Sequence, residues 1–364
     1  MKTIPIIQLG IGNVGREVIR QIQDLNKQHS DISFQYIGIA NSRKILFHKD
    51  GIPFPILKEI MLSKEIPTPG NVCETESHDG NLTPFNTRFS QIDLYQTTIV
   101  DTTDTDSHIR FLIHGVEQGT SLVLANKKPL VRSMDEFSRL TRTSFGFRAT
   151  VGAGLPVIPA ISELLSKNET IQKIEGCFSG SLGILCSSLE KGETFSTVVN
   201  ELKEKGFTEP DPREDLSGKD LARKILILSR LAGYNISLND ILIESLFPAE
   251  MTGFSSEEFL SGLTIMDDDY RDKFNQALQK NCTLRVVATF EKGECMVGLK
   301  EVTRDSLIGK LTGAEKLAVI YTENESINPI VVRGEGAGAK SAAKDVINDL
   351  LEVNQLNGNQ VSFQ

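Results

Sequence analysis

Gly10-Ile11-Gly12-Asn13-Val14-Gly15 lies between an apolar segment, 3–9, that predicts a strand and a segment, 13–28, whose apolar residues recur at helical spacing. Glycine lets the chain turn tightly and approach a pyrophosphate, and the N-terminus of the following helix offers free N–H groups to it. Such a glycine pattern is common by itself. Its place between a predicted strand and a predicted helix favours a dinucleotide site formed by Gly10, Gly12, Asn13, Val14 and Gly15.

The first 151 residues alternate between predicted strands and predicted helices. Extended segments are expected at 34–40, 97–101, 121–124 and 147–151, and helices at 106–118 and 134–143. This alternation predicts an α/β fold with a Rossmann-type, doubly wound parallel sheet. Segment 47–89 has proline and glycine punctuation and weak periodicity, so a long irregular excursion is expected there.

The pattern changes after residue 151. A helix is expected at 155–166, and extended segments are expected at 171–178, 284–291, 294–302, 317–321 and 329–332. Segments 284–291 and 294–302 are expected to form a hairpin through Lys292-Gly293, and the glycine-rich stretch 334–338 opens a final helix, 341–353. The second part is therefore expected to be an α+β domain with a mixed or antiparallel sheet backed by helices.

Composition excludes several classes of partner. A chain of 364 residues suits two joined domains, and a net charge of −9 without a basic tract argues against nucleic acid or an anionic membrane. The five cysteines are odd in number and form no Cys-x-x-Cys pair, which favours reduced thiols in a cytoplasmic protein. No apolar run approaches the roughly 18 residues of a membrane helix, and the scattered histidines argue against a zinc site.

The segment 206–224 combines carboxylates and an ammonium. Pro210 and Pro212 favour an extended path in an acid-rich loop, which runs into a helix that Ser217 is expected to cap. Asp220 and Lys224, at positions i and i+4, share one side of that helix. Such a set suits a small substrate that carries an ammonium and a reacting hydroxyl. A solvated, charged loop before an ordinary helix is the alternative that the spacing alone leaves open.

This segment resembles the catalytic signature of homoserine dehydrogenases. The resemblance continues in the family's order at 10–15, 40–43, 125–129, 151–159, 247–250 and 332–338, so it spans almost the whole chain. It is most similar to the dehydrogenase half of the fused aspartate kinase–homoserine dehydrogenase proteins, without a kinase ahead of it. The resemblance implies reversible, nicotinamide-dependent reduction of L-aspartate 4-semialdehyde to L-homoserine, a step of threonine and methionine biosynthesis.

The resemblance assigns roles to individual residues. Lys224 matches the group that donates and accepts the proton, and Asp220 matches the residue on the hydroxyl side of the substrate. Glu209 and Asp215 match the residues that bind the substrate's ammonium. Lys127 matches a catalytic lysine beside the nicotinamide and the substrate. Cofactor contacts are implied for Thr103, Lys127, Gly206 and Gly338.

The resemblance also implies the domain organisation. A dinucleotide-binding domain is expected at 1–152, completed by 335–364, and a substrate-binding and dimerisation domain is expected at 153–334. The family forms homodimers through the second domain. The hairpin from 284 to 302 fits this, because its strand edges would be covered by sheet extension across a two-fold axis.

The end of the second predicted strand bears on the choice of cofactor. The stretch 39–44 lacks the acidic residue that would hold a ribose 2′-hydroxyl, and Arg43 offers a planar guanidinium that could pair with a 2′-phosphate. This favours NADP, with NAD as the alternative. A surface arginine without a role in binding is the other interpretation.

Two departures from the family pattern concern the cofactor and a monovalent cation. Asp104 stands where the family has a serine, so its carboxylate must point away from a phosphate-rich cofactor. Carbonyls of Val151, Ala153 and Leu155 match the family's cation loop, but Arg148 replaces its one carboxylate. The guanidinium could occupy the cation's place, which makes a bound monovalent cation doubtful.

A third departure keeps other functions open. Residues 183–186, Gly-Ile-Leu-Cys, are smaller than the family's Ser-Tyr-Ile-Phe and could enlarge or soften the floor of the substrate pocket. A dehydrogenase of the same fold that acts on another small amino-acid aldehyde or alcohol is therefore an alternative. A non-catalytic cofactor-binding protein is another, although it would not need Glu209, Asp215, Asp220 and Lys224 together.

Overall fold

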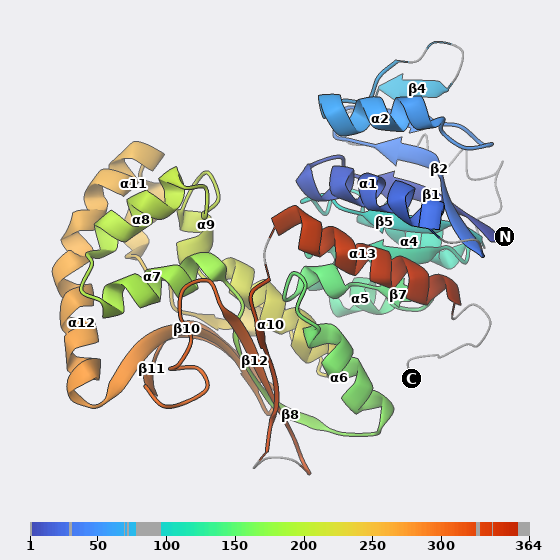
Figure 1. The fold of residues 1–364 in the computed structure, drawn as a ribbon. Coiled ribbons are helices and arrows are strands. Elements are labelled where there is room, and N and C mark those ends of the chain that lie inside the picture. The colour runs from blue at the N-terminus through green and yellow to red at the C-terminus, as the bar shows by residue number, and fades with distance from the viewer. Residues whose placement is uncertain are drawn as a thin grey trace. The chain divides into compact units, whose positions relative to one another are not determined.

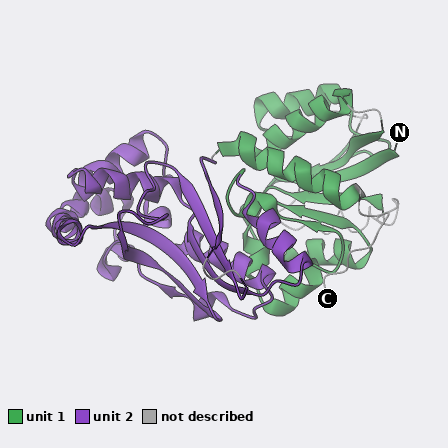
Figure 2. Ribbon diagram, turned by 60° about the horizontal axis from the view of Figure 1, so that its bottom comes forward, with its two compact units in different colours: residues 1–154, 337–364 green, residues 155–336 purple. Residues whose placement is uncertain are grey.

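The computed structural model describes residues 2–28, 31–68, 70, 73–77, 96–324, 328–336 and 338–355. The chain divides into two compact units, which Figure 2 distinguishes by colour. The first unit consists of residues 1–154 and 337–364, and the second consists of residues 155–336. In the described part of the chain, no helix is both long and apolar enough to cross a membrane.

The first unit is built on a seven-stranded sheet with the order β4-β3-β2-β1-β5-β6-β7. Its strands are β1 (Lys2–Leu9), β2 (Ile32–Ala40), β3 (Lys44–Phe47), β4 (Glu74–Ser77), β5 (Thr98–Asp101), β6 (Ser121–Leu124) and β7 (Phe145–Gly146). In the part of the sheet with the order β2-β1-β5-β6-β7, neighbouring strands are parallel. At the other edge, β2 pairs with β3 and β3 pairs with β4 in antiparallel fashion. The predicted parallel α/β sheet is confirmed, with an antiparallel edge added to it.

Helices of the first unit enclose an apolar core (Figure 1). They are α1 (Asn13–Gln28), α2 (Phe54–Ser63), α4 (Ile109–Glu117), α5 (Met134–Leu140) and α13 (Gly338–Gln355). The last helix of the chain packs against α1, and its Val346 and Leu350 join Ile6 and Val18 in one buried cluster. The C-terminal helix therefore completes the core of the unit that begins the chain.

The described part of segment 47–89 is more regular than expected. It contains α2, which buries Ile56, Leu57 and Ile60, and β4, which pairs with β3. The expectation of an irregular excursion was wrong there, because tertiary burial orders a helix whose own periodicity is weak. Residues 78–95 lie outside the described residues.

The strand expected at 147–151 was also wrong. The strand ends at Gly146, and Arg148–Thr150 form a 3-10 turn. A Cβ added to Gly146 would lie 2.5 Å from the Cβ of Asp349, so α13 packs directly on this point of the sheet. The N–H of Arg148 then donates to Asp349 Oδ2 at 2.8 Å instead of to a neighbouring strand.

The second unit contains a six-stranded sheet with the order β13-β12-β8-β10-β11-β9. Its strands are β8 (Ile171–Cys177), β9 (Leu242–Ile243), β10 (Cys282–Glu291), β11 (Glu294–Thr303), β12 (Lys316–Thr322) and β13 (Ile330–Gly334). The predicted hairpin is formed by β10 and β11, and its turn residues Lys292 and Gly293 have φ values of 49° and 94°. Positive φ at both turn positions is typical of tight two-residue hairpins.

Helices cover this second sheet. They are α6 (Val157–Ser166), α7 (Gly180–Glu190), α8 (Phe195–Glu204), α9 (Arg213–Leu216), α10 (Lys219–Leu231), α11 (Ser256–Gly262) and α12 (Asp267–Gln279). The helix α10 packs against β10 and β11 and buries Leu221, Ile225 and Leu228. Because these residues recur every three or four positions, Asp220 and Lys224 are left on the less buried side of the helix.

Candidate active site

Different constraints require glycine at different positions of the loop between β1 and α1. Gly10 has a φ of +94°, and a Cβ added there would lie 2.9 Å from the backbone of Thr102. A Cβ at Gly15 would lie 2.3 Å from the carbonyl oxygen of Gly10. A Cβ at Gly12, in contrast, would meet nothing within 4 Å in the described part of the chain. Packing explains Gly10 and Gly15, while Gly12 leaves open space before the first turn of α1.

A buried side chain that sequence reasoning missed holds this loop. Gln8 lies in the middle of the sheet, where its Nε2 donates to the carbonyls of Gly10 and Gly15 at 2.9 and 3.0 Å. Its Oε1 accepts a hydrogen bond of 2.8 Å from the hydroxyl of Tyr36, which is also buried. A lone amide in the otherwise apolar run 4–9 was the signal in the sequence.

Arg43 lies in the turn between β2 and β3. Asn41 Oδ1 accepts hydrogen bonds of 2.8 Å from the backbone N–H groups of Arg43 and Lys44, which fixes the turn and leaves the Arg43 residue exposed. The same strand end meets the glycine loop, because Gly10 N donates to Ala40 O at 2.8 Å. The positive side chain is therefore anchored at the strand end that adjoins the dinucleotide loop.

Two further predicted cofactor residues follow β5 and β6. The N–H and hydroxyl of Thr103 donate to Asp101 Oδ1 at 2.9 and 2.7 Å. Lys127 opens the short turn after β6 and is half-buried. Its neighbour Lys128 donates to the backbone oxygen of Asp104 at 2.7 Å and pairs with its carboxylate at 3.3 Å. The extra carboxylate of Asp104 is thus exposed and balanced by Lys128.

In the second unit, the ammonium of Lys224 has two oxygen partners. Nζ lies 2.6 Å from Asp220 Oδ2 and donates to the carbonyl of Phe178 at 3.0 Å. Phe178 lies two residues before α7, so α10 and the segment that leads into α7 meet at this ammonium. The side-by-side placement of Asp220 and Lys224 that the i, i+4 spacing predicts is confirmed.

The carboxylate of Asp215 lies in the same cluster. Ser181 Oγ donates to its Oδ1 at 2.8 Å, and the N–H of Glu209 donates to its Oδ2 at 2.9 Å. Burial raises the pKa of Asp215 despite these hydrogen bonds, with the nearby Asp220 carboxylate adding to the rise and Lys224 opposing it. Glu209 itself is exposed. A cationic ligand bound beside these carboxylates would stabilise their ionised forms.

Two details of this region differ from the sequence expectation. Ser217 does not cap α10, because it ends the short helix α9 and the chain then turns through Gly218 at a φ of +73°. Ser181, at the start of α7, was not singled out although it binds Asp215. The pattern Ser-Gly-Ser before an apolar run could have indicated both a helix start and a polar contact.

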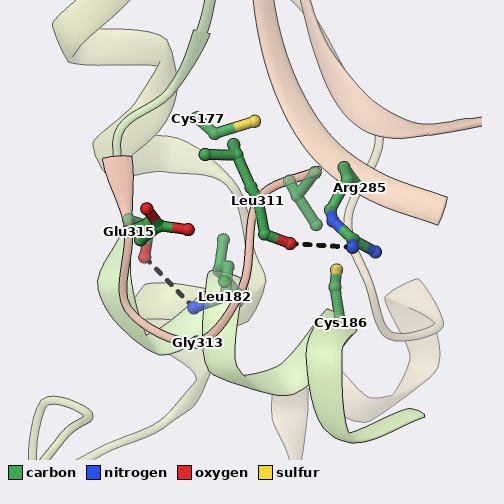
Figure 3. A pocket seen from close by; sticks show the side chains of 10 residues that line it. Cys177, Leu182, Cys186, Arg285, Leu311, Gly313 and Glu315 are labelled. Atoms are coloured by element: carbon green, nitrogen blue, oxygen red, sulfur yellow. Dashed lines mark hydrogen bonds between the residues drawn. The ribbon is translucent and has the colours of Figure 1, made fainter. Parts of the chain in front are cut away.

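The small residues of α7 do not open a large pocket. A Cβ added to Gly183 would lie 2.5 Å from the carbonyl oxygen of Gly313, and Gly313 N donates to Ser187 Oγ at 2.9 Å. Figure 3 shows Cys186 facing Arg285, which donates to the carbonyl of Leu311 at 2.9 Å. The remaining cavity has about 10 Å³, the room of roughly one water molecule. The loop before β12 therefore fills the space that larger side chains would take.

Carboxylates of α13 bind the loop from Arg148 to Leu155. The guanidinium of Arg148 pairs with Glu352 and, at 3.4 Å, with Asp349, so it faces α13. Gly154 N donates to Asp345 Oδ2 at 2.7 Å, and Leu155 O accepts from Val157 N at 2.8 Å. Burial raises the pKa of Asp349 to about 7. The guanidinium thus pairs with carboxylates, which are stronger acceptors than the loop carbonyls that the sequence left open as its alternative partners.

Comparisons with known proteins identify the family. The sequence model that describes the homoserine dehydrogenase family matches residues 156–351 of this chain. A homoserine dehydrogenase from Paracoccidioides brasiliensis is 31% identical over 373 residues, which cover 97% of this chain and 98% of that protein. This chain belongs to the homoserine dehydrogenase family.

A longer relative agrees with this homoserine dehydrogenase assignment, and a solved structure shares the fold. A chloroplastic bifunctional aspartokinase/homoserine dehydrogenase 1 from Zea mays is 32% identical over 98% of this chain. The chain spans 39% of the length of that relative. A hyperthermophilic archaeal homoserine dehydrogenase, solved in complex with NADPH, shares the fold with a TM-score of 0.75, 21% identity and full coverage of both chains.

In this homoserine dehydrogenase family member, the proposed ligand residues are divided between the two units. Gly10 to Gly15, Arg43, Thr103, Lys127 and Gly338 belong to the first unit. Gly206, Glu209, Asp215, Asp220 and Lys224 belong to the second. Gly206 and Gly338 both have positive φ, of 70° and 84°, and Gly338 begins α13.

Proposed function

We propose that this chain is a cytoplasmic, NADP-preferring homoserine dehydrogenase that interconverts L-aspartate 4-semialdehyde and L-homoserine. The observation that carries the proposal is the Lys224 ammonium, held by Asp220 at 2.6 Å and by the Phe178 carbonyl at 3.0 Å beside the half-buried carboxylate of Asp215. A reacting alcohol and a substrate ammonium need these two kinds of group. Membership in the homoserine dehydrogenase family supports the assignment.

Lys224 is the residue that transfers the proton. During reduction, an alkoxide develops on the substrate's former aldehyde oxygen, and Lys224 Nζ donates a proton to it. In the reverse direction the neutral amine accepts the proton from the hydroxyl of homoserine. Asp220 holds Nζ in place through the ion pair, while Asp215 and Glu209 bind the ammonium of the substrate. A bound reduced nicotinamide supplies the hydride.

The first unit offers the features that a dinucleotide needs. The open space at Gly12 admits a pyrophosphate to the N-terminus of α1, while Gly10 and Gly15 keep the loop close to the sheet. Arg43 at the end of β2 would pair with a 2′-phosphate, and Thr103 and Lys127 would contact the cofactor from the loops after β5 and β6. We therefore assign residues 1–154 with the C-terminal helix as the cofactor domain and 155–336 as the substrate domain.

A substrate panel tests the proposal. Formation of reduced nicotinamide, followed by its near-ultraviolet absorbance, should be saturable with L-homoserine and absent with D-homoserine, L-serine and L-threonine. Turnover of one of the other alcohols in preference to L-homoserine would indicate a dehydrogenase with another substrate. Binding of the cofactor without turnover of any alcohol would indicate a non-catalytic protein.

Replacing Arg43 by alanine should change the choice of cofactor. The variant should raise KM for NADP about tenfold or more, because a bidentate guanidinium–phosphate contact of roughly 1.5–3 kcal/mol is lost. KM for NAD should change little. Lys49→Ala provides a matched control, since Lys49 is also exposed but lies after β3. Equal changes for both cofactors in Arg43→Ala would show that Arg43 does not bind the 2′-phosphate.

Activity should depend little on sodium or potassium beyond ordinary ionic strength. Where the family pattern supplies a carboxylate, this chain has Arg148, which pairs with Asp349 and Glu352 and offers a cation no oxygen ligand from its side chain. Arg148→Glu should introduce a dependence on a monovalent cation. Saturable activation of the wild type by potassium, but not by tetramethylammonium, would contradict this expectation.

The protein should be a homodimer through the second unit. The β11 strand pairs on its outer side only with the two residues of β9, in the part of the chain that the structure describes. Leu242 of β9 and its partner Met296 are 66% and 38% exposed, which favours coverage by a second copy. Light scattering at micromolar concentration should give the mass of a dimer, and a monomer mass would refute the assembly.

A further inference from the structure

A single buried carboxylate joins the loops that follow β5 and β6. Asp101, the last residue of β5, is fully buried, and each of its oxygens accepts two hydrogen bonds. Oδ1 accepts from the N–H and the hydroxyl of Thr103 at 2.9 and 2.7 Å. Oδ2 accepts from His108 Nε2 at 2.9 Å and from Asn126 Nδ2 at 3.0 Å. Thr103, His108 and Asn126 therefore all donate hydrogen bonds to this one carboxylate.

Asn126 carries the connection to the second loop. Its Nδ2 also donates to Thr103 Oγ1 at 3.0 Å and to the carbonyl of Thr105 at 2.7 Å. Its Oδ1 accepts from Lys128 N at 3.0 Å, and Lys128 Nζ returns to the backbone oxygen of Asp104 at 2.7 Å. Both neighbours of Lys127 in the chain are therefore tied to the loop after β5.

We propose that Asp101 is a positioning residue that, through Asn126 and Thr103, holds Lys127 at the nicotinamide end of the cofactor site. The inference rests on the proposed function. Asp101 touches Thr103 and Asn126 and acts on the reaction only through them. Asn126 is 2% exposed and the side chain of His108 is nearly as buried, so water does not readily replace their bonds to the carboxylate. Because these bonds join the loop after β5 to the loop after β6, a shift of one loop also shifts the other.

The geometry explains why an amide would not serve at this position. Both oxygens of Asp101 face donors, so the NH₂ group of an asparagine would meet an N–H donor in either orientation. The expected effect of Asp101→Asn is a small shift of the 126–131 turn. A shift of about 1 Å at a reacting group can lower turnover about 10²-fold.

The test compares Asp101→Asn with Asp106→Asn. Asp106 lies in the same loop and undergoes the same chemical change, but its half-exposed carboxylate pairs with Arg132 at 2.9 Å. Asp101→Asn should lower kcat with L-homoserine about 10- to 100-fold and weaken binding of NADPH. Binding of adenosine 2′,5′-bisphosphate, which lacks the nicotinamide, should be unchanged. Asp106→Asn should match the wild type in all three measurements.

A double variant tests whether the two side chains act through the bond between them. Asn126→Asp keeps the shape of the side chain but sets a carboxylate oxygen against Asp101 Oδ2 and the carbonyl of Thr105, so it should lower kcat and speed hydrogen exchange of residues 126–131, as Asp101→Asn does. Because both changes break the same connection, the double variant should lose much less kcat than the product of the two single losses. Losses that multiply would show that Asp101 does not act through Asn126.

Two further results would overturn the proposal. One is an unchanged kcat in Asp101→Asn, and the other is an equal loss of affinity for NADPH and for adenosine 2′,5′-bisphosphate. If the wild type does not oxidise homoserine, the proposed function fails instead. The hydrogen-exchange comparison of Asp101→Asn and Asp106→Asn still decides whether the carboxylate holds the 126–131 turn, and equal exchange in the two variants would reject it.

Discussion

Lys224→Ala should lower kcat for homoserine oxidation by roughly 10²–10⁴-fold, the usual contribution of a positioned acid or base. The ammonium lies 2.6 Å from Asp220 and 3.0 Å from the Phe178 carbonyl, so it is held in one orientation before substrate binds. Alanine removes the group that donates the proton and leaves the glycine loop of the other unit unchanged. Affinity for NADPH should therefore be retained, and the loss should be seen in kcat.

The control for this variant is Lys219→Ala. Lys219 begins the same helix, α10, but it is exposed. Its replacement removes the same charge from the same helix, so it should leave kcat near the wild-type value. Near-normal turnover in Lys224→Ala would reject the role of Lys224 and make Lys127 the leading candidate for the acid and base.

Asp215→Asn should raise KM for homoserine about 10²-fold, which corresponds to the loss of a charged hydrogen bond of about 3 kcal/mol. Asparagine has nearly the same shape and can still accept from Ser181 Oγ, but its NH₂ group then faces the N–H of Glu209, so the effect includes the lost Glu209 contact as well as the lost charge. Steady-state kinetics with homoserine as the varied substrate will measure it. Glu214→Gln is the matched control, because Glu214 is the exposed neighbour in α9.

The same carboxylate predicts a pH effect. Because burial raises the pKa of Asp215, its ionised form begins to disappear at a higher pH than that of an ordinary aspartate. Binding of the substrate's ammonium needs the ionised form. KM for homoserine should therefore rise as the pH falls through this raised pKa, and the rise should be absent in Asp215→Asn. The same pH profile in both proteins would show that another group controls binding.

The parts of the fold that local sequence controls could be predicted. The hairpin turn at Lys292-Gly293 needs positive φ, which the glycine supplies, and the parallel sheet follows from alternating strands and helices. The strand expected at 147–151 failed because its conformation depends on Asp349, about 200 residues away in the chain. Local propensity does not contain that contact.

The candidate site was predictable to a similar extent. The spacing of Asp220 and Lys224 places them together, since one turn of helix separates them. Gln8, Asp101 and Ser181 were missed because their importance lies in bonds to distant loops or helices. The failure of Ser217 as a helix cap has the same cause, since the turn at Gly218 packs against the second sheet, where an added Cβ would lie 3.1 Å from Ile243.

The most direct measurement is the steady-state formation of NADPH from L-homoserine and NADP by the purified wild-type chain. The account predicts saturable formation at a rate proportional to enzyme concentration, with turnover on the order of 1–10³ s⁻¹. It also predicts that NAD supports the reaction less well at equal concentration. A folded protein that binds NADPH but forms none from L-homoserine at any concentration would contradict the account.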